Sequence, residues 1–289
     1  MSTENIITQY FLPISLGFIM LSVGLELTVG DFKRVLKQPK GFIIGALSQV
    51  LLLPAVAFVL VSLSGLSSAL AVGVMIIAAC PGGVTSNLLT YLARADTALS
   101  VSLTAIISLF SVLTLPIIVG GSIIHFMDAG EAPSVSIGRS VIGIFLITAL
   151  PVAVGITINR FAPAFAAAFE KRARHVATFL FIIIIAGAIY SERANVADYL
   201  AQAGMVTLCL NVAMIAISTA LARIAGLDRR QGTAITMECG LQNGTLAIFV
   251  ALTLLGNREM MIPGAIYSLI MFPTALAYLF FPARRSVVE

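Results

Sequence analysis

Glu238 lies in an apolar stretch, between positions 231 and 257, that holds no lysine or arginine. An ionised carboxylate in such surroundings needs compensation, because the charged form is poorly solvated there. The same stretch and three others carry side chains with neutral oxygen atoms, and oxygen ligands suit hard cations. One carboxylate with several neutral oxygens fits a monovalent ion better than calcium, whose sites recruit more carboxylates. The candidate ligands are Gln49, Ser86, Asn87, Ser100, Thr104, Gln242 and Asn243.

Two simpler interpretations remain open for these residues. Glu238 can be protonated and hydrogen-bonded to polar neighbours, without a cation. Single Ser and Thr residues in apolar helices also commonly hold helices together, which is our interpretation of Ser102 and Ser108. Ser100 and Thr104 are four residues apart and therefore share one helix face. That arrangement, together with the polar pairs 86–87 and 242–243, favours a binding site.

The elements that carry these residues are membrane helices. Hydrophobic residues make up 59% of the 289 residues and charged residues 10%, and the mean hydropathy is +1.05. Soluble domains are about 45–50% apolar and about 25% charged. We therefore predict an all-α integral membrane protein that forms a single membrane domain over residues 1–289. The net charge of +4 does not indicate nucleic-acid binding, because the basic residues form short clusters between apolar runs.

Apolar runs bounded by charged residues, Pro or Gly predict about nine transmembrane helices, since one crossing needs about 20 apolar residues. The first run has no basic residues before it and no small-residue cleavage site, so we expect a retained helix rather than a signal peptide. At membrane depth, an uncompensated charge at Glu238 costs at least about 2.5–3.5 kcal/mol. The predicted spans are 7–29, 40–63, 68–93, 97–125, 136–159, 173–190, 198–222, 230–255 and 260–282.

Two of these spans contain an interruption. The third holds Pro81 followed by two glycines, and the eighth holds Gly240 and Gly244 around a polar Gln-Asn pair. Proline removes a backbone donor and glycine weakens a helix. Because the third and eighth spans lie five apart, they run in opposite directions. Opposed, interrupted helices are typical of inverted-repeat transporters, in which they cross near the midplane.

The basic residues predict the orientation in the membrane, because cytoplasmic loops retain Lys and Arg. Of the 17 basic residues, 14 fall in alternate loops or at the C-terminus, which leaves Arg139, Arg193 and Arg258 on the other side. We therefore expect the N-terminus outside and the C-terminus in the cytoplasm, in the inner (plasma) membrane. That arrangement requires an odd number of helices. The 14 residues include Lys33, Arg34, Lys37, Lys40, Arg284 and Arg285.

The motifs at the two interruptions resemble those of the bile acid:sodium symporter family. They are Cys-Pro-Gly-Gly-Val-Thr-Ser-Asn from Cys80 to Asn87, Ala-Leu-Ser-Val-Ser-Leu-Thr from Ala98 to Thr104, and Glu-Cys-Gly-Leu-Gln-Asn from Glu238 to Asn243. The segment from Gly17 to Leu27 and the placing of Gln49 before Pro54 also fit. The chain is similar to the nine-helix, bacterial-type members.

The resemblance implies two sodium sites that share Glu238. The first would use Ser86, Asn87, Ser100, Thr104 and Glu238, and the second Gln49, Glu238, Gln242 and the backbone carbonyls of Cys239 and Leu241. It also implies alternating access, with two subdomains that move against each other. The core subdomain would cover about 40–125 and 198–282, and the panel subdomain about 7–29 and 136–190.

The expected substrate is an organic anion, because half-helices after each interruption present free N–H groups and positive dipole ends. The family suggests a bile acid-like molecule or a small carboxylate such as a pantoate-type acid. Family members often have Thr where this chain has Val84, so we assign substrate contacts to Gly83, Thr85 and Asn243. Membrane lipid is the other expected partner, and a monomer suffices for this arrangement.

Two other functions remain as alternatives. A cation/proton antiporter of related fold usually relies on intramembrane Asp pairs, which this sequence lacks. An intramembrane enzyme needs paired acids, metal-binding His or a nucleophile with a base. Glu238 stands alone in its stretch, and His125 and His175 lie at span ends or in loops. We therefore expect a transporter rather than an enzyme.

Overall fold

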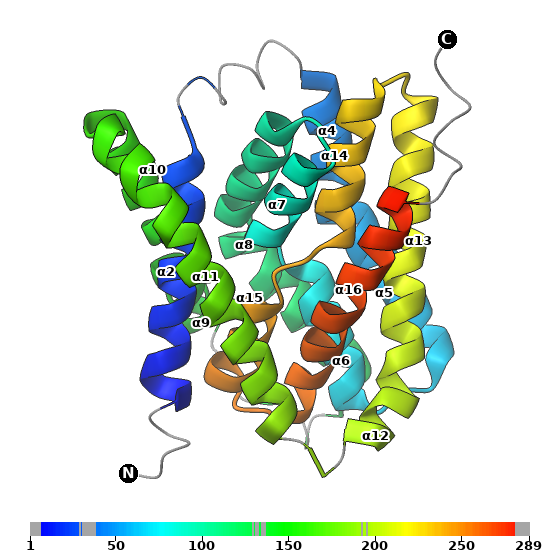
Figure 1. The fold of residues 1–289 in the computed structure, drawn as a ribbon. Coiled ribbons are helices and arrows are strands. Elements are labelled where there is room, and N and C mark those ends of the chain that lie inside the picture. The colour runs from blue at the N-terminus through cyan, green and yellow to red at the C-terminus, as the bar shows by residue number, and fades with distance from the viewer. Residues whose placement is uncertain are drawn as a thin grey trace.

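The chain forms a bundle of long apolar helices (Figure 1). The computed structural model describes residues 7–28, 30, 39–128, 130, 133, 137–191, 193–194 and 196–280. Lys33, Arg34, Lys37, Arg284 and Arg285, which contribute to the predicted orientation, lie outside these ranges. Seven helices in the described residues are long and apolar enough to cross a membrane: Gln9–Glu26, Pro39–Ser64, Thr97–Phe126, Ser140–Phe161, Arg172–Ser191, Ala197–Ile224 and Glu259–Phe280.

These seven helices match seven of the nine predicted spans. The other two are the interrupted ones, and each consists of shorter helices. The third span is α6 (Ser68–Ala79) followed by α7 (Val84–Leu92). The eighth is α14 (Arg229–Gly240), α15 (Gly244–Phe249) and the π-helical turn η5 (Val250–Leu254). Both interruptions therefore lie where Pro and Gly predict them.

One group of helices contains α2 (Leu12–Glu26), α10 (Leu150–Phe161) and α11 (Pro163–Ser191), which pack on one another. Glycines allow α2 and α10 to approach closely, since a Cβ on Gly24 would lie 2.3 Å from the carbonyl oxygen of Val152. Close approach through small residues is a common basis of helix packing in membranes. The preceding segments α9 (Ile137–Ile144) and η3 (Phe145–Ala149) lead into α10 and contact α8 (Thr97–Phe126).

The second group surrounds the two interrupted spans. It contains α8 (Thr97–Phe126), α13 (Met205–Ile224) and α16 (Ile262–Phe280), which contact α6, α14 or each other. It also contains the helix made of α4 (Pro39–Leu47), η2 (Ser48–Leu52) and α5 (Leu53–Ser64). Short segments complete the described chain: η1 (Ile7–Phe11), α12 (Val196–Tyr199), η4 (Leu200–Gly204) and η6 (Glu259–Met261).

The π-helical turn η2 places Gln49 in the interior. This turn ends at Leu52, two residues before Pro54, which has no N–H to donate to the preceding turn. Within this segment Gln49 is 2% exposed, whereas Leu47 and Leu51 are 52% and 61% exposed. Isolated π turns commonly occur at functional sites because they change which side chains face inward. The turn therefore directs an amide into the bundle beside the buried Ser48.

Candidate cation and substrate site

The two interruptions meet in the middle of the bundle. Gly82 and Gln242 form an antiparallel bridge, in which the backbone N–H of Asn243 donates to the carbonyl of Pro81 at 2.9 Å. The N–H of Gly83 lies 3.4 Å from the carbonyl of Leu241. In Figure 1, α7 and α14 lie above this crossing, and α6 and α15 lie below it. The interrupted spans thus run in opposite directions, as their positions in the sequence predict.

Glu238 lies at this crossing and is fully buried. The hydroxyl oxygens of Ser86 and Ser100 lie 2.7 Å and 3.1 Å from its Oε2. The hydroxyl of Thr104 donates to its Oε1 at 2.6 Å. Oδ1 of Asn87 lies 2.9 Å from the hydroxyl oxygen of Ser100 and 3.2 Å from that of Thr104. All five residues expected at the first site are therefore in one connected cluster, contributed by α7, α8 and α14.

The three hydroxyl donors around Glu238 face a larger number of acceptors, while Nδ2 of Asn87 is buried without a partner among the described residues. Each hydroxyl carries one proton, while an ionised carboxylate and an amide oxygen only accept. The single proton of Ser86 has two acceptors 2.7 Å away, Oε2 of Glu238 and the carbonyl of Gly83. Glu238 has no ion-pair partner within the described part of the chain. An excess of oxygen acceptors around a buried carboxylate is the environment that a hard cation requires.

The second expected site lies beside the first. Nε2 of Gln49 donates to the carbonyl of Glu238 at 3.3 Å, and Nε2 of Gln242 donates to the carbonyl of Cys239 at 2.9 Å. Their side-chain oxygens, which are buried, have no hydrogen-bond partner among the described residues. Buried polar atoms without partners are rare and are typical of strained or ligand-binding sites. The carbonyl of Leu241 is nearby but faces the amide of Gly83.

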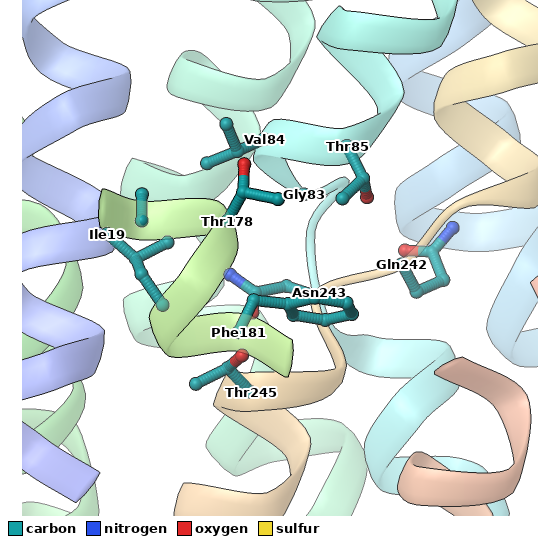
Figure 2. A pocket seen from close by; sticks show the side chains of 10 residues that line it. Ile19, Gly83, Val84, Thr85, Thr178, Phe181, Gln242, Asn243 and Thr245 are labelled. Carbon is teal, nitrogen blue, oxygen red and sulfur yellow. The ribbon is translucent and has the colours of Figure 1, made fainter. Parts of the chain in front are cut away.

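A small cavity lies between the crossing and helices α2 and α11 (Figure 2). Its volume is about 20 Å³, close to the roughly 10–15 Å³ that a single water molecule requires. All three expected substrate contacts, Gly83, Thr85 and Asn243, line it. The side-chain oxygen of Asn243 caps α15 by accepting from the N–H of Leu246 at 3.0 Å, so its NH₂ group is the part available to a ligand.

A larger cavity of about 250 Å³ lies between the same two groups of helices, toward the end of α7. Asn87 and Tyr91 line one side, Glu26 and Arg174 line the other, and Val84 lines both cavities. The side chain of Glu26 is only 7% exposed. It pairs with Arg174 at 3.1 Å, and Arg174 also contacts Glu170.

Comparison with known proteins agrees with this geometry. Residues 13–203 match the model of the sodium bile acid symporter family. The chain belongs to this family. The matched residues include the first interrupted span and its motif, whereas the second interrupted span lies beyond them.

Individual relatives extend the family similarity across most of the chain. This chain is 30% identical over 262 residues to YocS of Bacillus subtilis, which is named an uncharacterized sodium-dependent transporter. The matched region covers 89% of this chain and 78% of YocS. The chain is 28% identical to the probable chloroplastic sodium/metabolite cotransporter BASS2 of rice, covering 88% of this chain but 59% of that protein. It is 29% identical to the mouse ileal sodium/bile acid cotransporter, and the matched region covers 84% of this chain and 69% of that protein. These relatives are transporters, not enzymes.

Three residues of the site were not among those expected from the sequence. Gly82 faces Glu238 with no room for a side chain. Thr90 donates to Ser100 at 3.3 Å, and its spacing of three from Asn87 is the signal that places it on the same helix face. The hydroxyl of Thr245 is buried at the small cavity and has no partner among the described residues. Its spacing of two from Asn243 gives no comparable signal.

Proposed function

We propose that this protein is a sodium-coupled symporter of an organic anion. The observation that carries the proposal is the cluster of oxygen acceptors around Glu238 at the crossing of the two interrupted helices. A buried carboxylate that is ionised and has no cationic side chain beside it needs a positive charge from elsewhere. The relatives named as sodium-dependent transporters supply the identity of that charge, which is Na⁺.

Two sodium ions are proposed, one at each side of Glu238. The first site uses Ser86, Asn87, Ser100, Thr104 and Glu238, and the unpartnered amide oxygens of Gln49 and Gln242 support the second. An ion at the first site would draw together α7, α8 and α14. Hydroxyl protons can rotate away from it, so each hydroxyl oxygen can act as a ligand without a change of backbone.

The substrate is proposed to bind at the small cavity, next to Asn243. The NH₂ group of Asn243 and the first N–H groups of α7 offer donors to a carboxylate. A bile acid-like molecule or a pantoate-type acid exceeds the present volume of about 20 Å³. Binding therefore requires that α2 and α11 move away from the crossing.

This requirement suggests how access alternates. The panel subdomain (about 7–29 and 136–190) and the core subdomain (about 40–125 and 198–282) would move as two bodies, with both cavities at their boundary. Sodium fixes the interruptions and so favours anion binding, and the anion must favour sodium binding equally. With the C-terminus in the cytoplasm, the larger cavity would open toward the cytoplasm. One monomer would contain the whole transport pathway.

The experiment is uptake of labelled organic acids into proteoliposomes, driven by an inward sodium gradient or an equal potassium gradient. The proposal predicts uptake of at least one carboxylate with sodium and none with potassium. A proton gradient that drives uptake equally well without sodium would contradict it, and would favour proton coupling. The variant Glu238→Gln, which keeps the shape of the side chain and removes its charge, is expected to abolish sodium-driven uptake.

A further inference from the structure

The carbonyl of Gly240 is held by two side chains that take no part in either sodium site. Nδ2 of Asn211, on α13, donates to it at 2.7 Å, and the hydroxyl of Tyr267, on α16, lies 3.1 Å from it. Both side chains are fully buried, with 0% exposure. Gly240 ends α14, so its carbonyl has no partner further along the helix. Two helices of the bundle therefore supply donors to one carbonyl at the interruption.

The orientation of the Asn211 amide is fixed by a third residue. The hydroxyl of Thr274, about two turns beyond Tyr267 on α16, donates to Oδ1 of Asn211. The oxygen of this amide therefore faces Thr274, and its nitrogen faces Gly240. Thr274 also lies within hydrogen-bond distance of carbonyls in its own helix. The three side chains form a connected support behind the interruption.

The neighbouring carbonyls have different partners. The carbonyl of Cys239 accepts from Nε2 of Gln242, and that of Leu241 faces the amide of Gly83 across the crossing. The peptide plane that contains the Gly240 carbonyl also contains the N–H of Leu241, so a rotation of this plane redirects the residues on both sides. The N–H of Leu241 donates to the carbonyl of Met237 at 2.9 Å. The helix itself therefore holds one end of this plane, and Asn211 and Tyr267 hold the other, next to Gln242.

We propose that Asn211 and Tyr267 are positioning residues of the second sodium site. They hold the Gly240 carbonyl, satisfy it inside the protein, and leave the carbonyl of Cys239 and the amide of Gln242 oriented for the ion. Thr274 acts through Asn211. This inference rests on the proposed function and deepens it, because it assigns the geometry of one sodium site to side chains that never touch the ion.

The test compares variants that lose one hydroxyl each. Tyr267→Phe removes the donor to Gly240 and keeps the ring, and Thr274→Val removes the support of Asn211 and keeps the shape. Thr219→Val is the matched control, because Thr219 also bonds α14, at Thr236 (3.0 Å), but away from the interruption. Thr274→Ser keeps the hydroxyl and serves as the rescue. Purified proteins are heated in sodium or potassium, and the sodium concentration that gives half of the stabilisation is measured.

Loss of one hydrogen bond at the interruption should raise this sodium concentration about three- to tenfold. Tyr267→Phe and Thr274→Val should show this increase, whereas Thr219→Val and Thr274→Ser should retain the wild-type value. In potassium, Tyr267→Phe and Thr219→Val should lose similar stability. Equal sodium dependence in Tyr267→Phe and wild type would overturn the inference and leave the proposed function intact. No sodium effect in folded wild type would instead overturn the proposed function, and the inference with it.

Discussion

Gly82 lies so close to Glu238 that a Cβ atom on it would come within 2.0 Å of the carboxylate oxygen Oε1. No real Cβ contact is this short, and the carboxylate is held on its other sides by Ser86 and Thr104. The glycine at this position therefore makes room for the acid. This space lies in the interruption of the third span, between α6 and α7.

The first prediction follows from this contact. Gly82→Ala should displace the carboxylate of Glu238 and weaken sodium binding at least about tenfold, since overpacking commonly costs about 1–3 kcal/mol. Sodium binding to the purified protein is the measurement. Gly120→Ala is the control, because a Cβ there meets nothing within 4 Å. Unchanged sodium affinity in Gly82→Ala would show that Glu238 does not bind the ion in this position.

The second prediction concerns the unpartnered amide oxygens. Gln49→Leu or Gln242→Leu should remove the second sodium ion and keep the first, because the cluster of Ser86, Ser100 and Thr104 stays intact. The Hill coefficient for sodium in uptake should then fall toward one. Gln202→Leu, at an exposed glutamine, controls for the change of residue type. A Hill coefficient unchanged in both site variants would contradict the assignment of the second site.

The third prediction separates the anion from the sodium. Asp is as good a helix N-cap as Asn, so Asn243→Asp should retain the cap on α15 while losing the NH₂ donor and adding a negative charge at the small cavity. Sodium binding without substrate should persist, and the KM for the transported acid should rise at least about tenfold. Wild-type KM in this variant would exclude Asn243 as a substrate contact.

The fourth prediction tests the packing of α2 on α10. A Cβ on Gly155 would lie 2.6 Å from the carbonyl oxygen of Leu21. Gly155→Ala should therefore force the helices apart and lower the free energy of unfolding by about 1–3 kcal/mol. Gly187→Ala, with open space around its Cβ, should leave stability unchanged or slightly increased. Thermal unfolding in detergent distinguishes the two, and equal midpoints would contradict the close approach.

Much of the fold was predictable because the membrane restricts it. A charge-free apolar run of adequate length must be a helix, and Pro81 with its glycines marks the interruption. Glu238 and its ligands at Ser100 and Thr104 were also predictable, because a lone acid in an apolar stretch requires oxygen neighbours. The backbone carbonyls of Cys239 and Leu241 are predicted ligands on the family resemblance alone, because polarity does not reveal them.

Other features depend on contacts between distant segments. The Gly82 contact with Glu238 needs the crossing of two spans more than 150 residues apart. The pairing of Glu26 with Arg174 joins α2 to α11, and the support of Gly240 by Asn211 and Tyr267 joins three helices. Nothing in local spacing indicates such contacts, because each residue alone resembles an ordinary polar residue of a membrane helix.

Calorimetric titration of the purified protein with sodium, compared with potassium, tests the central claim most directly. Wild type and Glu259→Gln should show saturable, sodium-specific binding, because Glu259 contacts Ser67 at a helix end, away from the crossing. Glu238→Gln should show none, since the shape remains and the charge is lost. Sodium binding undiminished in Glu238→Gln, or no sodium-specific binding in folded wild type, would contradict the account.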